Sequence, residues 1–189
     1  MVVVIADAGP LIALAKIKRL HLLEDLFSEI LITQAVADEC LNVQSNDAVL
    51  IKQALDVGWL KCVANPLFQH ALSRSLGLGE QSCIEYALQS DSNTLLILDD
   101  ALARKHALRK QLLIVGSAAV LFTAQRKALI IDAETVIAEL NQVGYRISAI
   151  QSIMKIQLHE AQPFYSGHTP PSPYVRVSVH CLSSRGFFV

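Results

Sequence analysis

The sequence predicts an α/β fold, a three-layer α/β/α sandwich with a central parallel sheet. Short apolar runs, of which Val2 to Ile5 is the first, alternate along the chain with longer stretches of helical periodicity. The runs are apolar at successive positions, which is typical of strands covered on both faces. Hydrophobic residues make up 52% of the 189 residues, which is enough to bury such a sheet between two layers of helices.

The expected elements follow one another in the strand–helix order of a parallel sheet. Strands are expected at residues 2–5, 30–32, 59–63, 95–98 and 112–115. Helices are expected at residues 11–17, 20–27, 34–41, 48–57, from the glycines at 77 and 79 to Leu88, around Arg104, and at 118–128, 133–142 and 149–158. Residue types mark two boundaries: Gly9-Pro10 predicts a turn after the first strand, and Thr33 occupies a helix N-cap position.

We expect one domain over residues 1–158, followed by a tail. From about Gln162 the chain is rich in Pro, Ser and Gly and lacks helical periodicity. Residues 159–189 are therefore expected to form a flexible Pro/Ser-rich tail. Vector sequence or frame read-through produces tails of the same kind, so the sequence leaves a native and a non-native origin open.

Composition argues against several classes of protein. The formal net charge is −1, so nucleic-acid binding would depend on a local basic patch rather than on an overall positive field. No apolar run reaches the roughly 18 residues of a membrane span, and no basic residues precede the first run as in a signal peptide. The four cysteines form no CxxC pair, so we expect them to be reduced thiols. Together these features predict a cytoplasmic protein that does not associate with a membrane.

The first candidate site residue is Asp7, which ends the segment VVVIAD. A carboxylate at the tip of a buried strand, just before a helix, lies at the edge where open α/β sheets usually bind ligands. Such a group must be solvated, hydrogen-bonded or bound to a cation, because burying it alone is very costly. A turn or helix-cap role explains Asp7 equally well, and this stretch alone leaves both open.

Further acidic residues occupy related positions in the predicted topology. Glu39 lies in the helix after the second strand, Glu80 in a first helical turn, and Asp99-Asp100 at the tip of the fourth strand. In a parallel sheet these places share one edge, and carboxylates gathered there need a counter-charge. No His or Cys accompanies them, so the matching ion is Mg²⁺ or Mn²⁺, which can activate water for phosphodiester hydrolysis. Taken singly, each acid is also explained as an exposed, first-turn or N-cap residue.

Six segments carry a family resemblance over Met1 to about Ile156. They are IADAGPLIALAKI, ILITQAVADE, LGLGEQSCIEYAL, LLILDDALARKHA, IVGSAAVLFTAQRKALI and LNQVGYRIS. In their order and spacing the chain resembles the PIN-domain nucleases, in particular a VapC-like branch. The resemblance implies a PIN-like fold and a metal-dependent endoribonuclease. It also implies a toxin with an antitoxin partner and a homodimer, for which residues 11–17 and 20–27 could supply an interface or could be core.

The resemblance also assigns roles to residues. It implies that Asp7, Glu39, Glu80 and Asp100 are the catalytic acids, and that the metal is held by Asp7, Glu80, Asp99 and Asp100. Ser117 stands where this branch tends to carry a hydroxyl near the site, and the resemblance makes it a candidate substrate-binding residue. Two residues depart from the pattern: Thr33 replaces a frequent proline, and the third acid is Glu80 rather than Asp, which can change the metal spacing.

A local basic strip follows Asp100. Arg104, Lys105 and Arg109 lie within about one turn of each other and are candidates to bind RNA phosphates, largely without sequence preference. A solvated helix face explains the same residues. His106 alone is weak support for acid–base catalysis.

One other function remains open from the sequence, and two are disfavoured. A catalytically silent PIN-like module that binds RNA or a protein remains open. A receiver domain would carry two acids after the first strand and a lysine after the fifth, whereas Gly116-Ser117 follows the fifth here. A haloacid-dehalogenase-type phosphatase needs a second Asp two residues beyond the first, and Gly9 occupies that position.

Overall fold

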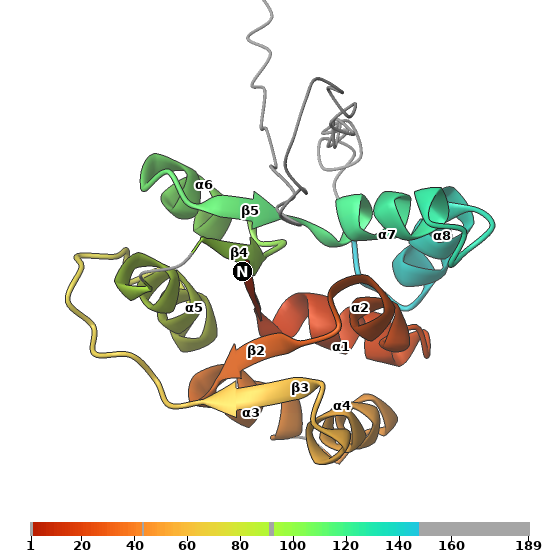
Figure 1. Ribbon diagram of the computed structural model, residues 1–189, viewed down its shortest axis with the longest axis horizontal. Coiled ribbons are helices and arrows are strands. Elements are labelled where there is room, and N and C mark those ends of the chain that lie inside the picture. Colours follow the sequence, from red (N-terminus) through yellow and green to blue (C-terminus); the bar gives the residue numbers. More distant parts are fainter. Residues whose placement is uncertain (1, 43, 91–92, 148–189) are drawn as a thin grey trace, which may run out of the picture.

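The computed structural model describes residues 2–42, 44–90 and 93–147. This part of the chain contains one sheet of five parallel strands in the order β3-β2-β1-β4-β5 (Figure 1). The strands are β1 (Val3–Ala6), β2 (Ile30–Thr33), β3 (Leu60–Val63), β4 (Thr94–Ile97) and β5 (Leu113–Val115). The predicted α/β sandwich with a parallel central sheet is confirmed.

Helices connect the strands and cover the sheet. They are α1 (Ala8–Lys16), α2 (His21–Phe27), α3 (Gln34–Leu41), α4 (Asn46–Val57), α5 (Leu78–Gln89), α6 (Ala101–Arg109), α7 (Ser117–Arg126) and α8 (Ala133–Gln142). In Figure 1, α5 and α6 lie on one side of the strands, and α1, α2, α7 and α8 lie on the other. This arrangement follows from right-handed crossovers that run one way across the sheet from β1 to β3 and the other way from β3 to β5.

Strand β1 is the centre of the sheet, between β2 and β4. Its register pairs Ile5 with Leu31 on one side and with Leu96 on the other. Because both edges and both faces of β1 are covered, Ile5 is fully buried. The two halves of the sheet also meet just beyond the strands, where the Asp7 amide donates to the Ile97 carbonyl at 3.0 Å. The tip of β1 is thus held beside the tip of β4.

Helix α1 begins earlier than predicted. The expected turn at Gly9-Pro10 is wrong, because both residues lie in the first turn of α1, with Asp7 at its N-cap. The first four amides of a helix have no partner within the helix, so the missing N–H of Pro10 costs nothing there. The other strand and helix boundaries differ from the expected ones by a few residues.

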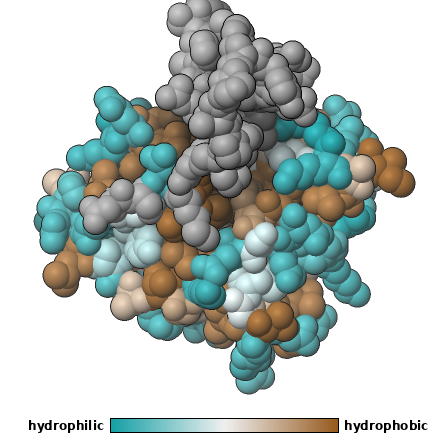
Figure 2. Space-filling view, in the orientation of Figure 1, coloured by the Kyte–Doolittle hydropathy of each residue, from teal (hydrophilic) through white to brown (hydrophobic). Residues whose placement is uncertain are grey.

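The apolar residues of α1 and α2 belong to the core. Leu11, Leu14, Leu22 and Leu23 are fully buried in the monomer, so the large apolar side chains of residues 11–17 and 20–27 pack mainly inside it. Hydrophilic residues line much of the rim of the face seen in Figure 2, as expected for helices that turn a polar side to water. None of the described helices is both long and apolar enough to cross a membrane. The predicted helix 149–158 and tail 159–189 lie outside the described residues.

Candidate active site

A polar cavity of about 280 Å³ lies at the carboxyl edge of the sheet. Four predicted acids line it, each from a different part of the chain. Its lining residues are Asp7, Glu39, Ser75, Gly77, Glu80, Asp100 and Leu102. The structure therefore brings together the four acids that the resemblance implies are catalytic, at the edge that parallel topology predicts for them.

Asp7 is the most enclosed of these acids. It follows β1, and only 7% of its surface is exposed. Burial, reinforced by the negative charges of Glu80 and Glu39, raises the pKa of Asp7 to about 7. A nearby cation would oppose both effects and return the carboxyl group to its ionised form.

Glu80 and Asp100 each use one carboxylate oxygen to cap a helix. The Gly77 amide donates to Glu80 Oε2 at 2.8 Å, and the Ala103 amide donates to Asp100 Oδ1 at 2.8 Å. Both acids therefore fill the capping roles expected of such positions and still face the cavity. Burial, together with the charges of Asp100 and Glu39, raises the pKa of Glu80 above its ordinary value, and the Gly77 amide partly opposes this shift.

Gly79 forms a close backing for two of the acids. A Cβ atom at this position would lie 3.0 Å from Glu39 Oε2, 3.2 Å from Asp7 Oδ1 and 3.3 Å from Val36 Cγ2. The absence of a side chain thus lets the carboxylates of β1 and α3 approach the first turn of α5.

Replacing Gly79 by Ala is expected to weaken Mn²⁺ binding about tenfold, because the methyl group displaces the carboxylates of Glu39 and Asp7. Alanine is a better helix former than glycine by about 1 kcal/mol, which offsets part of the strain. The melting temperature of the variant should therefore lie within a few degrees of that of the wild type. Calorimetric titration with Mn²⁺, alongside a thermal melt, measures both quantities. An unchanged Mn²⁺ affinity would show that the close approach has no bearing on metal binding.

The donor set fits a hard divalent cation. Every charged residue that lines the cavity is a carboxylate, and its polar neighbours are Ser75 and Gly77. Among the described residues, no three His, Cys, Asp or Glu side chains are grouped closely enough to hold a metal ion as they stand. Mg²⁺ is usually held by one or two carboxylates and retains several waters, so it does not require such a shell.

Asp99 has a different place from the other acids. It does not line the cavity but accepts three hydrogen bonds: from the Ser117 amide at 2.8 Å, the Ser117 hydroxyl at 2.5 Å and the Tyr145 hydroxyl at 2.6 Å. Ser117 is fully buried, and burial with the charge of Asp99 raises the pKa of Tyr145. Asp99 thus bonds to both Ser117 and Tyr145 instead of lining the cavity with the other acids.

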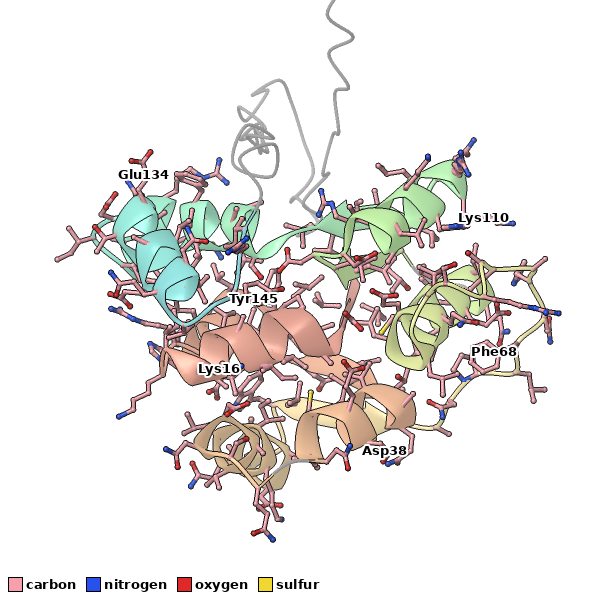
Figure 3. The ribbon with its side chains drawn as sticks, turned by 180° about the vertical axis from the view of Figure 1, so that it is seen from behind. Lys16, Asp38, Phe68, Lys110, Glu134 and Tyr145 are labelled. Carbon is pink, nitrogen blue, oxygen red and sulfur yellow. The ribbon has the colours of Figure 1, made fainter. Side chains whose placement is uncertain are left out.

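Tyr145 connects this cluster to the helix that begins after Asp7. Figure 3 shows Tyr145 between α1 and the α7–α8 pair. A Cβ atom on Gly9 would lie 3.2 Å from its hydroxyl oxygen and 3.8 Å from Asp7 Oδ2. The lack of an Asp at position 9 argued against a phosphatase. In the structure, the lack of any side chain at Gly9 leaves room for Tyr145 over the first turn of α1.

The basic strip is divided in the structure. Arg104 is half-buried, and its Nη1 atom donates to the Leu98 carbonyl at 2.9 Å. Burial lowers the pKa of Arg104, and the nearby charge of Asp99 opposes this. Lys105 and Arg109 are exposed, and Lys110 lies at the end of α6 far from the centre of the molecule (Figure 3). Arg104 therefore supports the end of β4, and only the two exposed cations of the predicted strip face solvent.

Sequence reasoning missed three contributors to this region. Ser75 and Gly77 come from the long connection before α5, and Tyr145 follows α8. The Leu76–Glu80 segment with its two glycines was a usable signal for close backbone approach. No local signal pairs Tyr145 with Asp99, since 46 residues separate them.

The fold and the cavity define a class of protein: a parallel α/β domain with clustered carboxylates at the carboxyl edge of its sheet. A family model, DUF3368, described as a PIN domain, matches residues 3–160. The chain therefore belongs to the PIN-domain family, whose members are generally nucleases that use divalent metals. A comparison with curated proteins gave no match.

Proposed function

We propose that the protein is a Mg²⁺- or Mn²⁺-dependent endoribonuclease of the VapC type, acting in the cytoplasm as the toxin of a toxin–antitoxin pair. The observation that carries the proposal is the convergence of Asp7, Glu39, Glu80 and Asp100 on one cavity. Membership of the PIN-domain family supports nuclease activity. RNA as substrate, the antitoxin and a homodimer rest on the VapC-like resemblance of the sequence.

In this proposal the acids divide the work. Asp7, Glu80 and Asp100 hold the cation, and the capping bonds of Glu80 and Asp100 restrict how far their carboxylates turn. When bound, a divalent ion lowers the pKa of a water and stabilises the leaving oxygen of the phosphodiester. Glu39, which is exposed at the cavity, accepts the proton that the attacking water loses.

The experiment that tests the function is cleavage of a mixed pool of structured RNAs with Mg²⁺, Mn²⁺ or EDTA. Asp100→Asn is expected to lower the cleavage rate at least about 100-fold. It removes the negative charge of a carboxylate that holds the cation, and the cation stabilises the transition state. The variant keeps one oxygen for the helix cap.

The matched control is Asp38→Asn, on the same helix as Glu39 (Figure 3). Asp38 is exposed, accepts a hydrogen bond from Gln34 and does not line the cavity. Its variant should cleave like the wild type. Cleavage that persists in EDTA, or equally in Asp100→Asn, would refute the proposed mechanism.

One observation favours a second candidate, a catalytically silent PIN-like module that binds RNA or a partner. No complete set of three metal ligands stands ready among the described carboxylates. Such a module would bind RNA without cleaving it and would show no Mn²⁺-dependent rise in melting temperature. Measuring that rise separates the two functions even before the correct RNA is known.

A further inference from the structure

The connection between β3 and α5, residues 64–77, is fixed at two points against α5. It runs along the outer side of this helix, where Figure 3 labels Phe68. At the first point the fully buried Glu85 accepts hydrogen bonds from the Gln69 amide at 2.9 Å and from His70 Nδ1 at 2.8 Å. Gln89 also donates to the Leu67 carbonyl. Burial alone would raise the pKa of Glu85, but these donors lower it below its ordinary value.

The second point lies at the start of α5. Gln81 Nε2 donates to the Leu76 carbonyl at 2.7 Å, and Glu80 Oε2 accepts from the Gly77 amide at 2.8 Å. Between the two points the chain makes a tight turn, in which the Leu76 amide donates to the Ser73 carbonyl at 3.1 Å. The connection is long, but its hydrogen bonds hold both sides of this turn.

Arg74 lies within this turn, beside the carboxylate cavity. The next residue, Ser75, lines the cavity. Arg74 is exposed, and it forms no ion pair within residues 2–42, 44–90 and 93–147. The residue that precedes Ser75 of the cavity lining thus carries an exposed positive charge, whereas the charged residues of the lining itself are all acidic.

We propose that Arg74 is a substrate-binding residue that contacts an RNA phosphate adjacent to the one at the carboxylates. The inference rests on the proposed nuclease function. Four carboxylates repel a phosphate backbone everywhere except at a bound cation, so a positive group at the rim would favour binding of the neighbouring phosphate. Arginine suits this role because its planar fork matches a phosphate in two parallel hydrogen bonds. A turn fixed on both sides also lowers the entropy cost of the contact.

This assignment complements the basic strip on α6. Arg104 is turned inward onto the Leu98 carbonyl and Asp99, which leaves Lys105 and Arg109 on that side. Arg74 comes from a different element, the connection before α5. An RNA strand bound across the carboxylates would then contact cations from two elements of the fold. Contacts from two elements define the orientation of the strand better than contacts from α6 alone.

The test compares wild type, Arg74→Ala, Arg74→Lys and Lys127→Ala in steady-state cleavage of a labelled single-stranded RNA between 50 and 200 mM salt. Lys127, an exposed cation at the end of α7, serves as the control. Arg74→Ala is expected to raise KM about tenfold, with kcat changed less than about twofold, and to reduce the salt slope of binding by about one. Arg74→Lys should lie between, because it keeps the charge and loses the fork.

Binding of the same RNA in the Asp100→Asn background, measured by fluorescence anisotropy, separates this inference from the function on which it rests. Cleavage by the wild type with an unchanged KM in Arg74→Ala would overturn the role of Arg74 and leave the nuclease standing. RNA that is neither cleaved by the wild type nor bound in the Asp100→Asn background would overturn both. Bound but uncleaved RNA, with affinity lost in Arg74→Ala, would support Arg74 while refuting catalysis.

Discussion

Replacing Asp7 by Asn is expected to abolish metal-dependent cleavage and, at the same time, to stabilise the metal-free protein at neutral pH. The variant removes the most enclosed carboxylate of the cavity and leaves the volume of the side chain unchanged. We expect the cleavage rate to fall by at least about 100-fold, since a group that acts directly on transition-state charge contributes on this scale.

The stability effect follows from the raised pKa of Asp7. In the folded, metal-free protein this pKa is about 7, against 3.8 for the group in an unfolded chain. The folded state thus keeps a proton that the unfolded chain releases near pH 4, so this stabilisation is complete below pH 4. It is lost as the pH rises to about 7, at a cost on the order of 4 kcal/mol. Asn carries no charge and should escape this loss.

Urea unfolding at pH 5 and pH 8, with EDTA and with Mn²⁺, measures the effect. The wild type in EDTA should lose stability between the two pH values, and Asp7→Asn should lose markedly less. Mn²⁺ should restore the wild type at pH 8 and do little for the variant, because bound metal stabilises only the form that binds it. Inactivity that comes from unfolding of Asp7→Asn would contradict a metal-ligand role for Asp7.

Replacing Asp99 by Ala is expected to have the opposite effect and to destabilise the fold by about 3 kcal/mol. The variant removes the acceptor of the Ser117 amide, the Ser117 hydroxyl and the Tyr145 hydroxyl, all of which are partly or fully buried. It also removes the negative charge beside the half-buried Arg104. A loss of this size lowers the melting temperature by roughly 10 °C for a domain of this length.

The adjacent acid provides the control. Asp100→Ala loses one N-cap bond to the Ala103 amide, which costs about 1 kcal/mol. Urea unfolding of both variants at pH 7 in EDTA should therefore separate them clearly, and Tyr145→Phe should fall between them, since it removes one of the three bonds. Equal stability of the two alanine variants would show that the bonds around Asp99 do not hold the end of β4.

The sequence by itself determined the class of fold and the edge where the acids gather. Apolar runs such as Val2 to Ile5 and the helical stretches between them carry a local periodicity, and alternation of the two predicts a parallel sheet. Parallel strands end at one edge, so Asp7, Glu39, Glu80 and Asp100 could be placed together without coordinates. The capping roles of Glu80 and Asp100 were also local, because a cap depends on amides within three residues.

Only the tertiary structure decided how neighbouring residues divide between the cavity and the interior. Asp99 and Asp100 are adjacent in an irregular segment, where no periodicity tells which one faces the site. Asp99 is held in the interior by hydrogen bonds from Tyr145 and Ser117, which lie 46 and 18 residues away in the sequence. Arg104 turns inward by the same kind of contact, and the bonds of Glu85 hold the connection that carries Arg74. Such pairings depend on which surfaces meet after folding, and a local pattern of residues does not record them.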